Sequence, residues 1–304
     1  MAKIAFLFPG QGSQYIGMAK DLFEKSVEAK EMIKTADDAL GVNLSYIMFN
    51  GPEEQLKQTE FTQPAIFLHS VVLASLMRTL QPEAAAGHSL GEYSALVNAN
   101  AVQFYDAIKL VRARGKAMQQ AGIDNPGTLA AIVGLNSDKV EELCKEASVE
   151  GIVQCANFNS PGQIVISGSI PGVRKAMELC KSSGAKLTKE LVVSGAFHSP
   201  LMQSAKDTLL DVLVLTPFYD ARFPVYANVS AKAVTKKDEI KNLLHQQVTA
   251  PVRWEETITN MIADGFDEFY EIGPGKVLQG LVKRINPDVK SFGIDKYEDL
   301  EKYL

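Results

Sequence analysis

The chain has 304 residues, with 36 acidic and 31 basic side chains and a formal net charge of -5, so its length fits one main α/β core with a smaller attached domain, and its charge argues against sequence-independent nucleic-acid binding. Its apolar segments are too short or too interrupted by polar residues to form a signal peptide or to cross a membrane, which takes about 20 apolar residues. Its three cysteines form no CxxC pair and no cluster with histidine, so we expect neither a disulfide framework nor a metal site, but buried or idle thiols in a cytoplasmic protein.

The first half of the chain alternates short apolar runs with helical patterns. KIAFLF predicts a strand followed by the glycine loop PGQGS, and residues 15–40 predict a charged amphipathic stretch. Thr62 is expected to cap a helix that has Pro64 in its first turn and runs through Arg78. EAAAG then predicts a short strand that leads through the turn GHSLG into a buried helix at EYSALVNANA.

The turn GHSLG places Ser89 at the GxSxG spacing of a nucleophile elbow. The elbow requires a strand, a sharp turn and a helix in this order, because the serine must stand above the carboxyl edge of a sheet. The predicted elements on either side of Ser89 supply that order. The sequence therefore predicts a serine nucleophile.

Between residues 127 and 197 the predicted strands and helices follow the order βαββαβ, which is typical of a ferredoxin-like unit. TLAAIVG, IVQCANF, QIVISG and AKLTKELVV predict four strands, whereas SDKVEELCKEA and IPGVRKAMELCKSSG predict two helices. Longer helices then return, with separate strands at FPVYANV, FDEFYEIG and VKSFGI. We therefore predict one subdomain from residues 1–126 and 198–304, and a small one inserted at 127–197.

A serine hydroxyl is a weak nucleophile until a neighbouring base accepts its proton, so the elbow predicts a histidine nearby. His69 is interpreted as a core histidine inside a helix, and His245 as part of a solvated face. His88 adjoins Ser89, and consecutive side chains diverge. His198 follows a strand and a glycine, at the loop position where such a base belongs. No acid stands out as a partner for this imidazole, and a backbone carbonyl is an alternative that the residues alone leave open.

The carbonyl that the serine attacks also needs donors for its developing negative charge. One donor is expected at the amide of the residue after the nucleophile, Leu90, and the other in a loop after another strand. The loop PGQGSQ at residues 9–14 is a candidate, since glycine lets a backbone N–H approach a ligand closely. A phosphate loop is disfavoured because no GK[ST] follows. EIGPGK at 271–276 is interpreted as a packing turn.

Several motifs occur in one order along the chain: FPGQGSQ, TQPA, GHSLGEYSAL, RGKAMQ, NSPGQIVISG, AFHSPLM and EIGPGKVLQGL. Together they resemble the malonyl-CoA:acyl carrier protein transacylases and the related acyltransferase domains of polyketide synthases, over essentially the whole chain. The resemblance implies an α/β fold in which an α/β-hydrolase-like large subdomain with a parallel sheet carries an inserted ferredoxin-like small subdomain. It also implies a site in the cleft between them.

The resemblance assigns roles to individual residues. It implies that Ser89 is the nucleophile and His198 the base, and that the backbone amides of Gln11 and Leu90 hold the oxyanion. It further implies that the main-chain carbonyl of Gln247 takes the place of the missing acid and orients the histidine.

The substrate also follows from the resemblance. From the pattern of LVRARGKAM alone, Arg112 and Arg114 are interpreted as solvated, but Arg114 matches the arginine that pairs with the free carboxylate of malonate. Phe197 belongs to the AFH sequence that malonyl-selective relatives commonly carry. Three further residues are expected along the acyl pocket and the pantetheine path: Gln63, Met118 and Asn157.

The activity that the resemblance implies is a ping-pong transfer of malonyl from coenzyme A, through a malonyl-serine ester, to the phosphopantetheine thiol of acyl carrier protein. Acyl carrier protein and the coenzyme A thioester are thus the expected partners, and no metal or other cofactor is expected. Fatty-acid synthesis is favoured over polyketide synthesis. A serine esterase or thioesterase using the same pair of residues is the alternative, and a non-catalytic module that binds a carrier protein is a third hypothesis.

Overall fold

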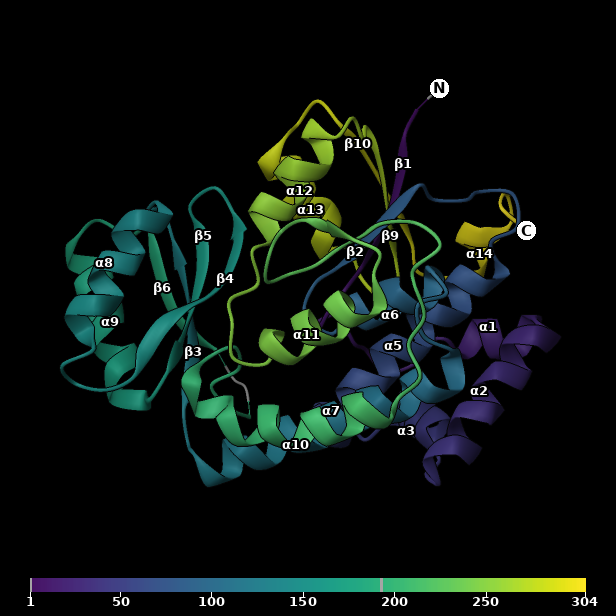
Figure 1. Ribbon diagram of the computed structural model, residues 1–304, viewed down its shortest axis with the longest axis horizontal. Helices are drawn as coiled ribbons and strands as arrows, with labels where there is room; N and C mark the ends of the chain where they lie inside the picture. The colour runs from purple at the N-terminus through teal and green to yellow at the C-terminus, as the bar shows by residue number, and fades with distance from the viewer. Residues whose placement is uncertain (1, 192–193) are drawn as a thin grey trace.

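Two sheets form the framework of the protein in the computed structural model, which describes residues 2–191 and 194–304 (Figure 1). The larger sheet has six strands, and its neighbouring strands are parallel except for the last pair. In spatial order these are β10 (Lys290–Ile294), β9 (Glu268–Ile272), β1 (Ile4–Phe8), β2 (Ala84–Gly87), β7 (Val225–Tyr226) and β8 (Ala233–Val234). The predicted α/β class and its parallel sheet are confirmed.

Helices cover both faces of this sheet. In chain order the helices outside the small unit are α1 (Lys20–Lys25), α2 (Val27–Leu40), α3 (Leu44–Asn50), α4 (Glu53–Leu56), α5 (Thr59–Leu76), α6 (Gly91–Asn98), α7 (Phe104–Asp124), α10 (Gln203–Leu215), α11 (Lys237–Gln247), α12 (Trp254–Ala263), α13 (Val277–Ile285) and α14 (Tyr297–Leu300). Among the described residues, no helix is both long and apolar enough to cross a bilayer.

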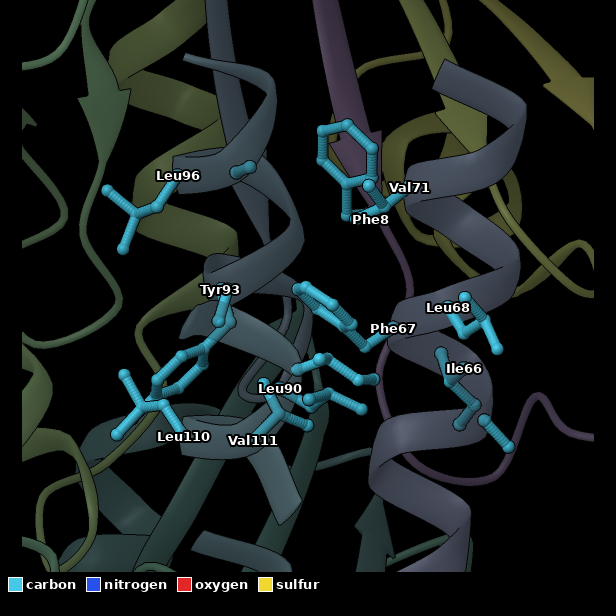
Figure 2. Close-up of a cluster of buried hydrophobic side chains, with 14 of the residues drawn as sticks. Phe8, Ile66, Phe67, Leu68, Val71, Leu90, Tyr93, Leu96, Leu110 and Val111 are labelled. Atoms are coloured by element: carbon cyan, nitrogen blue, oxygen red, sulfur yellow. The ribbon is translucent and has the colours of Figure 1, made fainter. Parts of the chain in front are cut away.

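The alternation of side chains along β1 explains the two layers of helices. Ala5 and Leu7 pack with residues of α12 and α13 on one face. Phe6 and Phe8 point to the other face and join the large core formed with α5, α6 and α7 (Figure 2). Because β1 is apolar on both faces, it must lie inside the sheet, as strands of a parallel sheet do. This position brings the glycine loop after β1 to the centre of the carboxyl edge.

The smaller sheet is antiparallel, with the spatial order β4 (Val153–Ser160), β5 (Gln163–Gly168), β3 (Thr128–Val133) and β6 (Leu187–Leu191). Helices α8 (Ser137–Ala147) and α9 (Ile170–Ser182) complete the βαββαβ order of a ferredoxin-like unit. The last two residues of the predicted closing strand, 192 and 193, lie outside the described residues. The three cysteines are free and buried, and all contribute to the core of this unit.

The start of α5 differs from the prediction. The helix begins at Thr59 and ends at Leu76, and Gln58 rather than Thr62 precedes it in extended conformation. The Thr62 hydroxyl instead donates to the carbonyl of Leu56, so its polar group is satisfied inside the bend between two helices. Pro64 consequently lies within the helix, where it cannot donate the usual backbone hydrogen bond.

The two sheets are joined directly by backbone hydrogen bonds. The Phe158 amide donates to the Val252 carbonyl at 2.9 Å, and the Val252 amide donates to the Ala156 carbonyl at 2.8 Å. Strand β4 is therefore tied to the segment that leads into α12 of the large subdomain. This connection holds β4 of the small unit against the large one.

Candidate active site

Ser89 stands on a sharp turn between β2 and α6. Its φ of 52° lies in the left-handed region, which a non-glycine residue rarely adopts. Gly91 makes the turn possible, because a Cβ at this position would lie 2.0 Å from the Phe8 carbonyl oxygen. Gly10 similarly lets the loop after β1 approach the elbow, since its Cβ would lie 2.4 Å from the His88 carbonyl oxygen. The GxSxG spacing thus forms the predicted elbow.

His198 contacts Ser89 directly. The two residues are 109 positions apart, and the Ser89 hydroxyl lies 2.8 Å from Nε2 of the imidazole. Nδ1 of His198 lies 2.8 Å from the Gln247 carbonyl and 3.2 Å from that of Ala250. Because carbonyls only accept, Nδ1 must carry the proton and Nε2 is left free to accept one from the serine. Sequence reasoning named both members of this pair.

The carbonyl of Gln247 is available because this residue ends α11. The last carbonyls of a helix have no partner within the helix, and the negative end of the helix dipole lies there. The negative end of the dipole stabilises the positive charge that His198 gains when it accepts a proton, so no carboxylate is needed for this purpose. The arrangement accounts for the missing acid of a serine, histidine and aspartate triad.

Burial strongly lowers the pKa of His198, to about 3, and the positive charge of Arg114 lowers it further in the same direction. The imidazole is therefore neutral near neutral pH. A neutral imidazole with a free Nε2 is the form that can act as a general base toward Ser89.

Arg114 is buried, with 1% of its surface exposed, contrary to the solvated position that its helical pattern indicates. Its guanidinium donates to Oε1 of Gln63 at 2.7 Å, to the Ser89 hydroxyl at 3.1 Å and to Oε1 of Gln247 at 3.0 Å. Among the described residues, no carboxylate lies within ion-pair distance of it. Arg112 is also largely buried, but it pairs with Glu60 at 3.3 Å, away from Ser89.

A buried cation without an ion pair is costly, and an anion bound beside the Arg114 guanidinium would offset that cost. Neutral acceptors hold it in place on two sides, and its third contact is the serine oxygen. A ligand carboxylate that approaches Ser89 from the cavity would reach the same guanidinium.

The cavity beside Ser89 has a volume of about 240 Å³. Side chains of the small sheet, of α13 and of the loop after β1 line it, so it lies in the predicted cleft between the two units. Its lining includes all the other predicted pocket and oxyanion residues: Gln11, Gln63, Leu90, Met118, Asn157 and Phe197. Gln247 and Arg114 do not line the cavity, and both contact the residues that do: Gln247 contacts His198, and Arg114 contacts Ser89 and Gln63.

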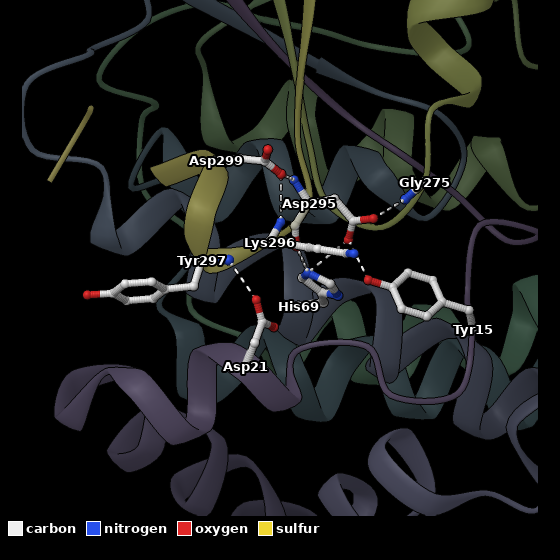
Figure 3. Close-up of polar contacts among 8 residues, drawn as sticks. All are labelled: Tyr15, Asp21, His69, Gly275, Asp295, Lys296, Tyr297 and Asp299. Atoms are coloured by element: carbon white, nitrogen blue, oxygen red, sulfur yellow. Dashed lines mark hydrogen bonds and ion pairs between the residues drawn. The ribbon is translucent and has the colours of Figure 1, made fainter. Parts of the chain in front are cut away.

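A polar network supports the loops at the edge of this cavity (Figure 3). The Asp295 carboxylate accepts from the Tyr15 hydroxyl at 2.8 Å and from the Gly275 amide at 3.2 Å. His69 is buried in α5, and its Nε2 donates to the Asp295 carbonyl at 2.7 Å. The interpretation of His69 as a core histidine is confirmed. The network joins the loop after β1 to the loop after β9.

Three polar residues around the elbow were missed by the sequence reasoning. Asn228 accepts from the Ser89 amide at 2.7 Å and donates to the Gly87 carbonyl at 2.7 Å. Glu92 is buried behind the elbow, and Gln154 donates to the His198 carbonyl at 2.8 Å. Asn228 is the second residue after β7, at the same sheet edge as the elbow, and this position was an available signal for its place in the site.

The chain is similar to known proteins over nearly its whole length. The family model described as "Acyl transferase domain" matches residues 5–292. The chain is 46% identical over 304 residues to a malonyl CoA-acyl carrier protein transacylase of Bacillus subtilis, covering 99% of this chain and 96% of the relative. It is 44% identical over 302 residues to the protein of the same name in Staphylococcus aureus, covering 99% and 98%.

Solved structures are similar over the same extent. An acyl carrier protein S-malonyltransferase of Vibrio cholerae has a TM-score of 0.95 at 41% identity, covering 99% of both chains. A malonyl-transacylase in complex with a type II polyketide synthase acyl carrier protein has a TM-score of 0.95 at 40% identity, covering 100% of this chain and 99% of that one.

Proposed function

This chain belongs to the acyl transferase family, and from that membership we propose that it moves a malonyl group from malonyl-CoA to the phosphopantetheine thiol of acyl carrier protein. The observation that carries the proposal is the double contact of the Ser89 oxygen. It lies 2.8 Å from the base nitrogen of His198 and 3.1 Å from the guanidinium of Arg114. The nucleophilic oxygen is therefore in contact with both its proposed base and the proposed binding group for the malonyl carboxylate.

In the first half-reaction, the Ser89 oxygen attacks the thioester carbonyl of malonyl-CoA while His198 takes the hydroxyl proton. The backbone amides of Gln11 and Leu90, which line the cavity on either side of Ser89, are proposed to stabilise the oxyanion. The carbon–sulfur bond then breaks, and the histidine returns its proton to the departing coenzyme A thiolate. A malonyl ester of Ser89 remains.

The second half-reaction reverses these roles. The phosphopantetheine thiol of the carrier protein enters the cavity and gives its proton to His198. The thiolate attacks the ester carbonyl, and Ser89 leaves with the proton from the imidazole. Both half-reactions use only residues of this chain and the two thiol substrates, so we propose that the enzyme has no resident metal or other cofactor.

Arg114 is proposed to select the acyl group by pairing with the free carboxylate of malonate, which an acetyl group lacks. Gln63 holds the guanidinium and touches the Met118 sulfur at 3.5 Å, so both residues shape the end of the acyl site. Phe197 forms a wall next to the base, and Asn157 lies on the small-sheet side of the cavity, where the pantetheine arm is proposed to pass.

We further propose that the enzyme acts in fatty-acid synthesis in the cytoplasm, without a nucleic-acid or membrane partner. The thioesterase alternative is not favoured, because the named relatives are transacylases.

A two-stage labelling experiment tests this function. Purified protein receives malonyl-CoA labelled in the malonyl group, and acyl carrier protein with its phosphopantetheine arm is added afterwards. We expect stable label on the protein that moves to the carrier protein. Steady release of free malonate without protein-bound label would identify a thioesterase, and the absence of any reaction would identify a binding module.

A further inference from the structure

We infer that Glu92 is a positioning residue for acyl selection: its carboxylate holds the side-chain amide of Gln247 in the one orientation that presents an oxygen to Arg114. The inference rests on the proposed function and adds to the same site a residue that acts through Gln247 on Arg114. Glu92 contacts neither Ser89 Oγ nor the cavity, so it would act only through other residues.

The carboxylate of Glu92 is buried at the start of α6, with 3% of the residue exposed. Its Oε2 accepts from Nε2 of Gln247 at 2.8 Å and from the Asn228 amide at 3.0 Å. Both donors belong to segments far away in the chain, beyond β7 and at the end of α11. Glu92 therefore joins two parts of the large subdomain directly beneath the elbow.

The chemistry of the two charged groups permits only one orientation of the amide between them. An ionised carboxylate only accepts hydrogen bonds, and a guanidinium only donates them. Gln247 must therefore turn its NH₂ to Glu92 and its Oε1 to Arg114, as the distances of 2.8 and 3.0 Å show. The flipped amide would set NH₂ against the guanidinium and oxygen against the carboxylate.

The same contacts hold the backbone of the nucleophile. Gln247 Nε2 donates to the Ser89 carbonyl at 3.0 Å, and Asn228 Oδ1 accepts from the Ser89 amide at 2.7 Å. Glu92 fixes Gln247 through its side chain and Asn228 through its backbone. Ser89 has a strained φ of 52°, which the surrounding structure must maintain. The residues that hold its backbone N–H and C=O are the two that Glu92 fixes.

Charge gives a second reason for a carboxylate at this position. Arg114 has no ion pair among the described residues, and Glu92 is the acid that reaches it through a single amide. The negative charge of Glu92 thus partly balances the guanidinium in the empty site. It does so through the amide of Gln247 and without touching the guanidinium, so it forms no direct ion pair that a substrate carboxylate would have to replace.

The substitution Glu92→Gln tests the inference, because it keeps the size of the side chain and removes its charge and its acceptor-only character. The measurement is the ratio of kcat/KM for malonyl-CoA to that for acetyl-CoA. We expect the ratio to fall about tenfold, the effect of one weakened hydrogen bond to a charged group. The conservative variant Glu92→Asp, which keeps the carboxylate, should recover part of the ratio.

A matched control is Glu60→Gln, which removes the charge of another partly buried acid that pairs with Arg112 outside the site. This variant should keep the wild-type ratio. A folded Glu92→Gln protein with an unchanged ratio would overturn the inference, and so would an equal loss of activity on both substrates, which is the pattern of a merely structural residue.

The wild-type enzyme offers a second test that does not depend on a variant folding. Burial raises the pKa of Glu92 to about 7, so the carboxylate gains a proton below that pH and becomes a donor. Of the titratable groups around it, Arg114 stays charged, burial raises the pKa of Tyr93 to about 12, and the pKa of His198 is about 3.

None of these neighbours changes charge between about pH 6 and about pH 8. The ratio of malonyl to acetyl transfer should therefore fall as the pH decreases across this range in the wild type, and should be flat and low in Glu92→Gln. A flat ratio in the wild type would contradict the inference. Failure of the proposed function is distinguishable, because the wild-type enzyme would then transfer no malonyl group at any pH.

Discussion

Two residues from distant parts of the chain, Arg114 and His198, meet at the hydroxyl of Ser89. Arg114 donates to its oxygen at 3.1 Å, so the hydroxyl hydrogen is free to point to His198 at 2.8 Å. The Ser89 hydroxyl is therefore the donor and His198 Nε2 the acceptor before any substrate binds, which is the direction that proton transfer requires. A guanidinium next to the oxygen also favours the negative charge that develops as the proton leaves.

The substitution Arg114→Ala should reduce malonyl transfer strongly, because it removes the proposed partner of the substrate carboxylate. We expect the loss in kcat/KM for malonyl-CoA to correspond to about 2 to 5 kcal/mol, the range for truncating one side of a buried charge pair. Steady-state kinetics with malonyl-CoA and acyl carrier protein measure this loss. Acetyl transfer should decrease much less.

Arg112→Ala is the matched control, since Arg112 lies on the same helix and is also largely buried but pairs with Glu60. It should change malonyl and acetyl transfer by the same small factor. If both arginine variants lose malonyl transfer equally, Arg114 has no specific part in recognising the substrate.

The residues of the site differ in how far the sequence alone predicted them. Ser89 and His198 could be named because elbow spacing and loop position translate directly into geometry. The burial of Arg114 could not, since its helical pattern does not reveal that α7 is packed between α2, α5 and α10. Glu92 and Asn228 were missed because their partners lie 155 and 139 residues away in the chain.

At the scale of elements, the elbow depends on the close approach of α6 to the end of β1. Gly91→Ala should misplace the loop after β1, because the added Cβ would lie 2.0 Å from the Phe8 carbonyl oxygen. We expect a loss of several kcal/mol in the free energy of unfolding, or a folded protein with little activity, as for other backbone clashes in a packed core. Chemical denaturation and a transfer assay distinguish the two results.

Gly280→Ala is the corresponding control, at a glycine in α13 where an added Cβ would meet no atom within 4 Å. Alanine is the better helix former, so this variant should gain up to about 1 kcal/mol in the free energy of unfolding and keep its activity. If the two variants had the same free energy of unfolding and the same activity, the close contact between α6 and β1 would not be needed to form the elbow.

Elements with strong patterns were predicted well. The strands at β1 and β2 and the βαββαβ order of the small unit all follow from apolar alternation and turn residues. The start of α5 and the two-residue strand β8 were not foreseen. In both places a tertiary contact decides the structure: Thr62 bonds back to Leu56, and β8 is defined by its pairing with β7.

At the scale of the whole molecule, buried histidines should make the protein sensitive to acid. Burial lowers the pKa values of His69, His88 and His198, so the unfolded chain binds more protons than the folded one below about pH 6.5. The free energy of unfolding should therefore fall as the pH decreases from about 6.5. Glu92 and Glu271 act in the opposite sense, because burial raises their pKa values.

Urea denaturation at about pH 7 and about pH 5 measures this dependence. His69→Gln removes one of the three histidines without touching the catalytic pair. Its unfolding free energy should change less with pH than that of the wild type, by roughly 1 kcal/mol per pH unit. An identical pH dependence in the two proteins would exclude a neutral His69 in the folded state.

The division into two units also belongs to this scale. The change in the order of predicted strands and helices near residue 127 predicted the inserted unit. The described strands of the small sheet lie between residues 128 and 191. The direct connection between the two units could not be predicted, because it pairs β4 with Val252, two segments far apart in the chain. The boundaries at 126/127 and 197/198 remain our proposal.

The claim on which the whole account depends is that acyl transfer passes through an ester on Ser89. Mass spectrometry of peptides from protein quenched shortly after mixing with malonyl-CoA tests it most directly. We predict a single malonyl group, located on Ser89, that disappears when acyl carrier protein is added and never forms in Ser89→Ala. A malonyl group on another residue, or continued transfer by Ser89→Ala, would contradict the account.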